Sequence, residues 1–554
     1  MAAKVRTAAV SPGSHVADLT VAEQVAEALV NAGVEVAFTF PGGGSNLALL
    51  DALQVRGVAT VLTRSEVGGG LMASTAADIN GNPGSLIVGL GPGAASAVNA
   101  VAHARLDRSP LLLVADRYSD AELATTGHQV IDQRALFAPL VKAYVDAGPD
   151  DLGVQLSRAI GLALQPPRGP VLIEMARDHA RSPVSGHAED PGGADAAPAS
   201  LVESDVADAA ELARGARKPV VLVGDEARRD VDPAGLVALA ERLRAPVMSS
   251  YKGKGVFPDS HPLAAGIVTG AEIERPLLSE ADLLLTVGLD PVELLARPWT
   301  YDAPVLALRL GPEADEYLRP RVTLAGPIDA SLAALRATLG TPASEWVPGD
   351  AAKRAGAMLR QLRNEGGELP AWRVVEIAQE LAGDARVTVD AGAHMFPVTW
   401  LWRSERPNRF HISNGLATMG YALPAAIGAA LAAPGEPVLA FTGDGGFTIN
   451  AAELETAARV GAKVIVLVLN DSSLSLIRVK QEQNRQERSN VDFVRSDFAR
   501  LAESLGVKGA RASRESELRA ALGAALAADA TTVIDIQIDG SEYTETHRRV
   551  RSGS

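Results

Sequence analysis

The stretch from residue 438 to residue 471 reads VLAFTGDGGFTINAAELETAARVGAKVIVLVLND, and it predicts the local fold. Two apolar runs, Val438 to Thr442 and Val464 to Leu469, each have the length of a buried strand. The segment between them has the apolar spacing of a helix that Asn450 would cap and Gly461 would end. Strand, helix and strand in this order predict a unit of a parallel sheet.

Each of the two predicted strands is followed by an acidic residue. Asp444 stands between Gly443 and Gly445, and Asp471 follows the second strand. Because the carboxyl ends of parallel strands meet at one edge of a sheet, both carboxylates could hold a cation against a diphosphate. The spacing adds the backbone carbonyl of Ser473 as a third protein ligand for Mg²⁺. The alternative is a tight turn in which Asp444 only caps the next helix.

Four motifs, in order along the chain, resemble those of the thiamine diphosphate enzymes. They are Thr63-Arg64-Ser65-Glu66, Gly91-Pro92-Gly93-Ala94, Gly415-Leu416-Ala417-Thr418-Met419-Gly420, and Gly443-Asp444-Gly445 paired with Asn470-Asp471. The motifs run from residue 63 to residue 471, so the resemblance covers most of the chain. Within this family the chain is similar to the acetolactate synthase (acetohydroxyacid synthase) group.

The length of 554 residues suits about three or four domains. Short apolar runs alternate with helical patterns, which predicts the α/β class with doubly wound parallel sheets. The resemblance implies three such domains: pyrimidine-binding (1–183), central (200–342) and diphosphate-binding (369–540). Polar, Gly- and Pro-containing connectors are expected at 184–200 and 343–367.

Strands are expected wherever the apolar runs are short and bounded by turn residues. In the first domain, where each strand is expected to be buried on both faces, the runs are 34–40, 58–63, 85–90, 110–115 and 171–175. In the second domain the runs are 220–223, 246–249, 283–287 and 305–308. The arginine-rich tail with Arg548, Arg549 and Arg551 is expected to be disordered.

Composition narrows the class of protein. A net charge of −15 argues against nucleic acid and against an anionic membrane surface as partners. The absence of cysteine excludes disulfides, thiolate metal sites and cysteine nucleophiles. We see neither an apolar run of about 18 residues nor a signal peptide, so the expected location is the cytoplasm.

The resemblance assigns roles to further residues. Glu66 would hydrogen-bond the aminopyrimidine ring as the catalytic carboxylate, although a helix N-terminus also favours a carboxylate by its dipole alone. Met419 would bend the cofactor, the Ala417 carbonyl would accept from its amino group, and His394 would either bind the diphosphate or cap its turn. The implied cofactor contacts are Gly91, Pro92, Gly93, Ala391, Gly392, Ala393, His394, Ala417, Met419, Gly443, Asp444, Gly445, Gly446, Asp471, Leu474, Ser475 and Leu476.

The resemblance also implies a reaction on a small 2-oxo acid. His128 and Gln129 would lie in the substrate pocket, where simple pyruvate decarboxylases have two histidines. Fewer proton donors favour transfer of the decarboxylated acyl unit to a carbonyl acceptor, as in a carboligase. Val479 would enlarge the acceptor pocket, because we place it where related synthases have tryptophan.

Other outcomes remain open. The enzyme could be a decarboxylase or carbon–carbon lyase that releases an aldehyde, or the chain could be a catalytically silent regulatory paralogue. Intact Glu66, Asp444 and Asp471 argue against the silent protein. In this family the cofactor joins different subunits, which implies a homodimer or homotetramer with active sites at the subunit interface. Flavin is not expected, because the central-domain stretches 266–270 and 288–292 depart from those of flavin-containing synthases.

Overall fold

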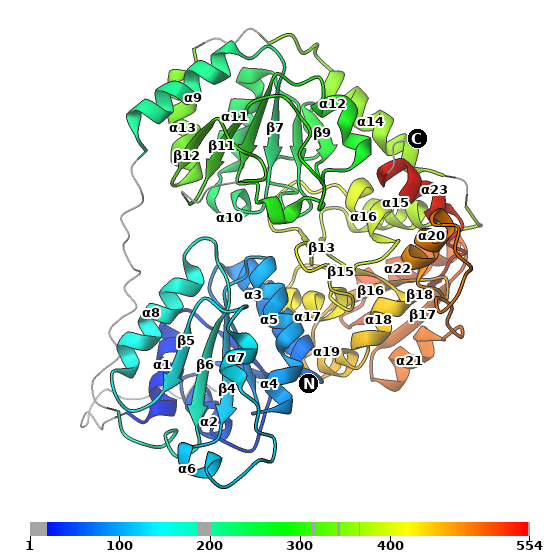
Figure 1. Cartoon of the computed structure of the whole chain (residues 1–554). Helices are drawn as coiled ribbons and strands as arrows, with labels where there is room; N and C mark the ends of the chain where they lie inside the picture. The colour runs from blue at the N-terminus through cyan, green and yellow to red at the C-terminus, as the bar shows by residue number, and fades with distance from the viewer. Residues whose placement is uncertain (1–18, 185–200, 312–315, 341–343, 365, 552–554) are drawn as a thin grey trace. The chain divides into compact units, whose positions relative to one another are not determined.

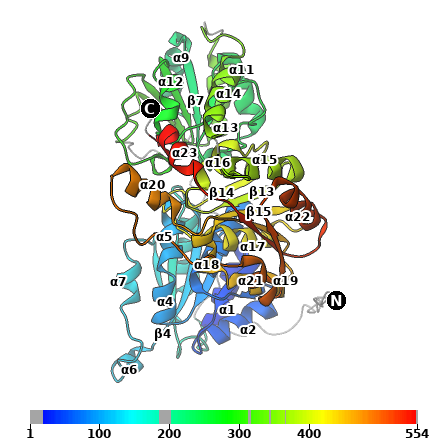
Figure 2. The same ribbon diagram turned by 90° about the vertical axis from the view of Figure 1, so that its right-hand side faces the viewer.

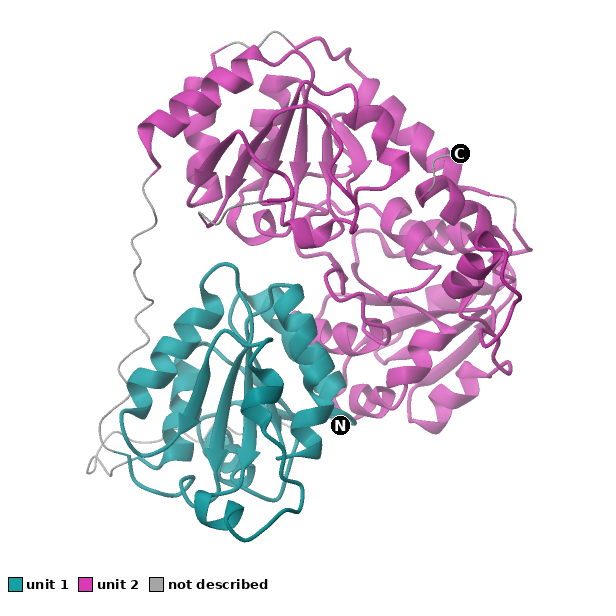
Figure 3. Cartoon of the chain, in the orientation of Figure 1, with its two compact units in different colours: residues 1–194 teal, residues 195–554 magenta. Residues whose placement is uncertain are grey.

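The computed structural model describes residues 19–184, 201–311, 316–340, 344–364 and 366–551. These residues form three six-stranded parallel sheets with helices on both faces of each (Figures 1 and 2). The predicted α/β class is therefore confirmed. The chain folds into two compact units, residues 1–194 with one sheet and residues 195–554 with two (Figure 3). The boundaries of the three predicted domains stay a prediction.

The sheet of the first unit has the strand order β2-β1-β3-β4-β6-β5. Its strands are β1 (Val36–Phe40), β2 (Ala59–Leu62), β3 (Gly84–Val88), β4 (Leu111–Arg117), β5 (Tyr144–Ala147) and β6 (Val171–Ala176). The expectation that every strand is buried on both faces is wrong for β2, where Val61 alone is buried, because this edge strand pairs only with β1. The short edge strand β5 escaped prediction, since its four residues carry no continuous apolar run.

Eight helices accompany this sheet in the described part of the first unit. They are α1 (Val21–Asn31), α2 (Asn46–Val55), α3 (Glu66–Asn80), α4 (Pro92–Ser96), α5 (Val98–Leu106), α6 (Asp120–Leu123), α7 (Gln133–Phe137) and α8 (Leu152–Leu164). Helices α3 and α5 approach closely at Gly70 of α3, where an added Cβ would clash with Ala100 of α5. Glycine at this position lets α3 and α5 pack together, which fixes the direction in which α3 leaves Glu66.

The central sheet of the second unit has the order β12-β11-β10-β7-β8-β9. Its strands are β7 (Pro219–Val223), β8 (Val247–Ser249), β9 (Ala264–Ile267), β10 (Leu283–Val287), β11 (Val305–Arg309) and β12 (Val322–Ala325). Its helices are α9 (Glu203–Gly215), α10 (Ala227–Asp230), α11 (Pro233–Leu243), η1 (Glu272–Glu274), α12 (Arg275–Leu278), η2 (Pro291–Glu293), α13 (Ile328–Thr338) and α14 (Asp350–Leu362).

The C-terminal sheet has the order β14-β13-β15-β16-β18-β17. Its strands are β13 (Arg386–Val389), β14 (Phe410–Ile412), β15 (Val438–Gly443), β16 (Val464–Asn470), β17 (Lys508–Ala512) and β18 (Thr532–Gln537). Its helices are α15 (Ala371–Ala382), α16 (Met395–Leu401), α17 (Ala422–Ala432), α18 (Asp444–Asn450), α19 (Glu453–Val460), α20 (Ser475–Gln483), α21 (Phe498–Ser504), α22 (Glu515–Ala527) and α23 (Glu542–Arg551). The chain reverses direction across the sheet between β13 and β15, and ligands of such folds bind in the crevice at this switch point.

The strand–helix–strand prediction for residues 438–471 holds, with one correction. Two helices, α18 and α19, connect β15 to β16, and Gly461 ends α19 in the left-handed conformation. Asn450 is not the predicted N-cap, because it is the last residue of α18 and its side chain donates to the Gly420 carbonyl at 2.8 Å. This bond ties α18 to the loop before α17.

Two predicted irregular segments contain helices. Residues 343–367 include α14, whose Met358 and Leu362 pack in the main core of the second unit. The tail that was expected to be disordered forms α23, in which Tyr543 and Val550 are buried. Of the predicted connector 184–200, residues 185–200 lie outside the described residues.

One hydrophobic core joins the two sheets of the second unit. Tyr251 and Ile267 of the central part pack with Phe396, Trp400 and Trp402 of the C-terminal part. Shared burial of large aromatic side chains explains why these two sheets form a single compact unit. None of the helices formed by the described residues combines the length and the apolar character that crossing a lipid bilayer requires.

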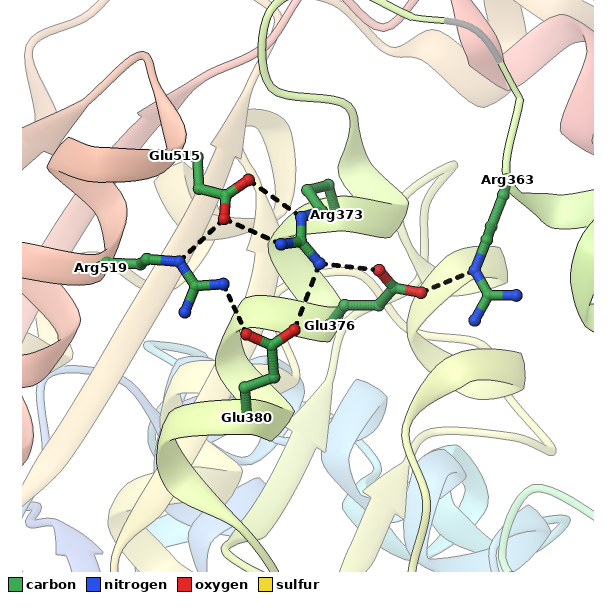
Figure 4. Close-up of polar contacts among 6 residues, drawn as sticks. All are labelled: Arg363, Arg373, Glu376, Glu380, Glu515 and Arg519. Atoms are coloured by element: carbon green, nitrogen blue, oxygen red, sulfur yellow. Dashed lines mark hydrogen bonds and ion pairs between the residues drawn. The ribbon is translucent and has the colours of Figure 1, made fainter.

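A surface ion network links α15 to α22 (Figure 4). Arg373 of α15 donates two hydrogen bonds, of 3.0 and 2.8 Å, to the two carboxylate oxygens of Glu515 in α22. The same guanidinium also donates to Glu376 and Glu380 of α15. Arg519 of α22 donates a further hydrogen bond to Glu380. The side-chain hydrogen bond from Arg373 stabilises the negative charge of Glu515, so the pKa of Glu515 falls to about 2. Such exposed networks orient helices and add little stability individually.

The close packing of α21 on β17 gives a test of the fold. Gly509 of β17 faces the backbone of Ala499, and a Cβ at this position would clash with the Ala499 carbonyl. We expect Gly509→Ala to lower the free energy of unfolding by about 3 kcal/mol. The matched control Gly523→Ala in α22 meets open space and should raise it by about 0.5 kcal/mol, because alanine favours helices. Equal urea unfolding midpoints for both variants would contradict this packing.

Candidate active site

Asp444 and Asp471 lie at the carboxyl ends of β15 and β16, which pair directly through Gly443 and Leu469. Asp444 is 5% exposed and accepts from its neighbour, the Gly445 amide, at 2.8 Å. Its second carboxylate oxygen is buried without a hydrogen-bond partner in the structure. Asp471 accepts a short hydrogen bond from the Ser475 hydroxyl at the start of α20.

The two carboxylates are electrostatically unfavourable without a cation. Burial raises the pKa of Asp444 to about 6, and the negative charge of Asp471 contributes to this rise. Burial also raises the pKa of Asp471. Within the described residues no group of three or more His, Cys, Asp and Glu side chains could hold a metal ion. Two carboxylates with an unpartnered oxygen fit Mg²⁺, which completes its shell with backbone, ligand and water oxygens.

Glycines make room around these carboxylates. A Cβ at Gly446 would clash with the carboxylate of Asp390, and one at Gly540 would clash with that of Asp471. A Cβ at Gly445 would lie 2.9 Å from Leu474 Cδ2. Backbone amides without neighbouring side chains can approach an anion closely, so this turn fits a diphosphate beside the metal.

Asp390 is a further site residue that the sequence analysis did not single out. It follows β13 at the switch point and accepts from the Thr442 hydroxyl at 2.9 Å and from the Tyr421 amide at 3.2 Å. Full burial raises its pKa to about 7. An acidic residue directly after the short run Val387-Thr388-Val389 was the available signal. It fixes the loop before α17 against β15.

The ring of His394 packs between two glycines. Positions for a Cβ at Gly392 and Gly443 lie 2.7 Å and 3.1 Å from atoms of this ring. The imidazole makes no capping bond to the amides at the start of α16, but a hydrogen bond with the Asp390 backbone acts on its pKa, so capping of this turn stays a prediction. Burial lowers its pKa to about 4, which leaves a neutral ring near pH 7, and its Nε2 is buried without a partner. Contact of His394 with a diphosphate remains a prediction.

Apolar side chains converge over Gly445. Leu474 Cδ2, Phe493 Cε2 and Met419 Cε lie 2.9, 3.4 and 3.6 Å from the position of its Cβ. Met419 is 37% exposed, so it is available to a ligand and is not core filling alone. The preceding Ala417 has φ of +53°, a left-handed conformation that turns the loop and its carbonyl. Phe493 gave no signal in the sequence, because it lies in a polar stretch.

The structure does not support the predicted role of Val479. This side chain is 0% exposed and belongs to the hydrophobic core of the second unit. It lies on the face of α20 that packs inward, so it lines no accessible pocket. Ile477 and Lys480 occupy the exposed face of the same helix. Ser473 directs its hydroxyl to the Val491 carbonyl at 3.1 Å, which leaves its own backbone carbonyl as the predicted ligand.

In the first unit, Glu66 begins α3, and Ser65 caps this helix by accepting from the Gly68 amide at 2.9 Å. A Cβ at Gly93 would lie 3.3 Å from the Glu66 carboxylate. The absence of a side chain at Gly93 therefore leaves space beside this carboxylate. A helix dipole alone would lower the pKa of this carboxyl, whereas burial raises it. The helix-capping alternative therefore does not account for the environment of Glu66.

A second group of the first unit surrounds Gly91. Its amide donates to the Gln133 side chain at 2.7 Å, and its φ of +56° brings it against the Gln129 carbonyl. Gln133 also donates to the carboxylate of Glu174, which accepts from the Tyr144 hydroxyl at 2.7 Å. These residues line a cavity of about 380 Å³. Gln133 and Glu174 gave no signal in the sequence, because their contacts join segments far apart in the chain.

Gln129 and His128, the two residues of this region that are predicted to lie in the substrate pocket, differ in their position relative to the cavity. Gln129 lines the 380 Å³ cavity, whereas His128 is exposed and is not among the lining residues. The structure thus brings Gln129, but not His128, to the cavity beside Gly91.

Three family models match the chain. They are described as thiamine pyrophosphate enzyme N-terminal TPP binding domain at residues 19–136, central domain at 206–335, and C-terminal TPP binding domain at 390–536. The matches follow the three sheets in order. Glu66 lies within the first matched region, and Asp444 and Asp471 lie within the third.

Similar relatives include enzymes that are named for two different reactions. Acetolactate synthase of Bacillus subtilis is 30% identical over 544 residues, which cover 94% of this chain and 93% of the relative. A probable 2-ketoarginine decarboxylase of Pseudomonas aeruginosa is 31% identical over 537 residues, covering 94% of each chain. The solved thiamine diphosphate-dependent 4-hydroxybenzoylformate decarboxylase of Rhodococcus jostii has a TM-score of 0.83. At 24% identity over 94% of this chain and 99% of that one, it shows the fold.

The raised pKa of Asp444 gives a test on the metal-free protein. Because folding raises this pKa from 3.8 to about 6, the wild-type protein loses stability as pH rises through this interval. Asp444→Asn removes the charge, so at pH 8 in EDTA it should be more stable than wild type by about 2 kcal/mol. When Mg²⁺ and thiamine diphosphate are added, the wild-type protein should instead be more stable than Asp444→Asn.

The control for this test is Asp539→Asn. Folding lowers the pKa of Asp539, whose carboxylate accepts from the Ser541 amide and hydroxyl. Its neutral variant should therefore be less stable than wild type at pH 8. If Asp444→Asn also lost stability in urea unfolding with EDTA, the two carboxylates would not repel each other as described.

Proposed function

Because this chain belongs to the thiamine pyrophosphate enzyme family, in its acetolactate synthase-like group, we propose a specific reaction for it. With thiamine diphosphate and Mg²⁺ bound, it decarboxylates a small 2-oxo acid and transfers the remaining acyl unit to a carbonyl acceptor. The observation that carries this proposal is the pair of buried carboxylates, Asp444 and Asp471, at the carboxyl ends of two paired strands.

The C-terminal sheet holds the metal and the diphosphate. Asp444, Asp471 and the backbone carbonyl of Ser473 are the proposed Mg²⁺ ligands. Gly445 and Gly446 lie at the start of α18, where the helix N-terminus favours an anion, although the Gly445 amide itself donates to Asp444. When bound, thiamine diphosphate supplies the carbon nucleophile and the electron sink for decarboxylation.

Glu66 is the proposed proton-holding group. Burial raises the pKa of this carboxyl, which favours its sharing a proton with a ring nitrogen of the cofactor. The space that Gly93 leaves beside it is where this ring would approach. A helix-end carboxylate without a catalytic role would need neither the space nor the raised pKa.

Apolar residues shield the reacting part of the substrate from water. Met419, Leu474 and Phe493 converge above Gly445 and are partly exposed, so they are free to close on a bound molecule. Exclusion of water favours loss of a carboxylate, because the charge is less well solvated. The bent form of the cofactor would rest on Met419.

The second candidate function is decarboxylation with release of an aldehyde. It is supported by the similar relatives that are named as decarboxylases. The exposed position of His128 supports the carboligase, because a proton donor outside the cavity is less able to protonate the acyl unit.

We further propose that the active enzyme is a homodimer or a homotetramer in which two chains complete each site. The proposal rests on the family, since its N-terminal and C-terminal TPP binding domains both match this chain. The absence of flavin stays a prediction, and absorbance near 450 nm in the purified protein would contradict it.

Glu66→Gln tests the catalytic carboxylate. The change keeps shape and hydrogen bonding while removing the shared proton, so we expect kcat to fall about 10²- to 10⁴-fold. Affinity for thiamine diphosphate, measured by calorimetry, should change little. Glu27→Gln in α1, a partly exposed glutamate, is the control and should keep wild-type turnover. Wild-type carbon dioxide release by Glu66→Gln would refute the assignment.

Product analysis separates the two functions. Incubation with pyruvate, alone and with added aldehydes, should yield 2-hydroxy ketones or 2-acetolactate, detected by mass spectrometry, in excess of free acetaldehyde. Acetaldehyde as the main product would establish the second candidate. Carbon dioxide from no member of a 2-oxo acid panel would favour a silent paralogue.

A further inference from the structure

Three cationic side chains of the second unit, those of Arg297, Lys480 and Arg551, act electrostatically on His547 of α23. Arg551 lies one turn further along the helix, and its backbone carbonyl accepts from Arg297 Nη2 at 3.1 Å. On α20, Gln483 lies 2.9 Å from His547 Nδ1, and Lys480 precedes Gln483 by one turn. Burial, followed by the charges of Arg551, Lys480 and Arg297, lowers the pKa of His547 to about 4.

These cations have few compensating carboxylates. Arg551 stacks on Phe396 with its guanidinium carbon 5.2 Å from the ring centre, and its buried Nη1 has no hydrogen-bond partner. Lys480 is exposed, and among the described residues it makes neither an ion pair nor a side-chain hydrogen bond. Arg297 approaches one acid, Glu272, at 3.6 Å. A partly buried guanidinium nitrogen left without an acceptor is costly unless a ligand completes it.

The nearby carboxylates of the same two helices are engaged elsewhere. Glu482 of α20 accepts from the Thr544 hydroxyl at 2.8 Å and lies 3.8 Å from Arg478. Glu545 of α23 is held by Arg548 and Arg549. The cluster of Arg297, Lys480 and Arg551 therefore carries excess positive charge in a chain whose net charge is −15.

Both helices lead from the proposed metal site to this cluster. Ser475, the first residue of α20, donates a hydrogen bond to Asp471, and a Cβ at Gly540, just before α23, would lie 2.2 Å from the same carboxylate. Figure 2 shows α20 beside α23. At 1.5 Å per residue, Lys480 lies about 8 Å along α20 from Ser475. A substrate bound at the proposed metal and cofactor site could therefore place an anionic group at its other end near this cluster.

We propose that Arg297, Lys480 and Arg551 recognise a second anionic group of the substrate, so that the enzyme prefers a 2-oxo acid with a distal carboxylate. The inference rests on the proposed function and names its substrate class. The guanidinium of Arg551, stacked on Phe396, is a fixed donor, while Lys480 and Arg297 are exposed cations that can close on the carboxylate.

The test compares each dicarboxylic 2-oxo acid with its uncharged isostere on the enzyme loaded with Mg²⁺ and thiamine diphosphate. Carbon dioxide release is measured with 2-oxoglutarate, 2-oxoadipate, their distal monoamides, and pyruvate. For at least one of the two dicarboxylic acids, we expect kcat/KM to be about tenfold or more higher than for its distal monoamide. Raising the salt concentration should reduce this ratio, because part of the cluster is exposed.

Lys480→Gln and Arg297→Gln should each raise KM for the preferred dicarboxylate about fivefold or more, with kcat and the amide's kinetics little changed. Both side chains are exposed, so the variants should fold. The matched control is Lys508→Gln, an exposed lysine at the amino end of β17, opposite the two carboxylates, which should leave the ratio unchanged.

Equal kcat/KM for both acids and their amides, with turnover of pyruvate intact, would overturn this inference and leave the proposed function standing. If Lys480→Gln raised KM equally for the dicarboxylic acid and for its amide, the inference would be overturned as well. Carbon dioxide from none of the 2-oxo acids would instead overturn the proposed function.

Discussion

The C-terminal site depends on two carboxylates that are held close together away from water. Asp444 and Asp471 gain no cationic side chain of their own strong enough to offset burial, since the pKa of each is raised. A protein maintains such a repulsive arrangement when binding of a cation offsets its cost. The parallel pairing of β15 with β16 imposes the arrangement, because it brings both strand ends to one edge.

The surroundings of the carboxylates are built for close approach. Gly446 leaves room for Asp390, Gly540 leaves room for Asp471, and Gly392 with Gly443 encloses the neutral ring of His394. Buried polar groups then link neighbouring loops: Asp390 joins β13, β15 and the loop before α17. The result is a closely packed base at the proposed anion and metal site, with partly exposed apolar side chains above it.

Each of the two units contributes a different chemistry. The first places a single partly buried carboxylate, Glu66, at the start of a helix, and a buried Gln133–Glu174–Tyr144 chain fixes the turn at Gly91. The second contains the two carboxylates proposed as metal ligands and, along α20 and α23, the cations proposed to bind an anionic substrate group. In this proposal, acidic side chains serve the metal and the proton, and cationic side chains serve the substrate.

The sequence alone determined the α/β class, the strand–helix–strand unit, and Asp444 and Asp471 as candidate residues, while Glu66 became a candidate through the resemblance of its motif to a known family. Strand ends and glycine turns are local, so apolar runs and their flanking residues are enough to locate them. The roles of Asp390, Gln133 and Phe493, the burial of Val479 and the folding of the arginine-rich tail into α23 appeared only in the tertiary structure. Each of these depends on contacts between segments distant in the chain: which face of α20 packs inward, for example, is decided by α23 and the core. Periodicity can assign residues to a helix, but only packing decides which of them face a ligand.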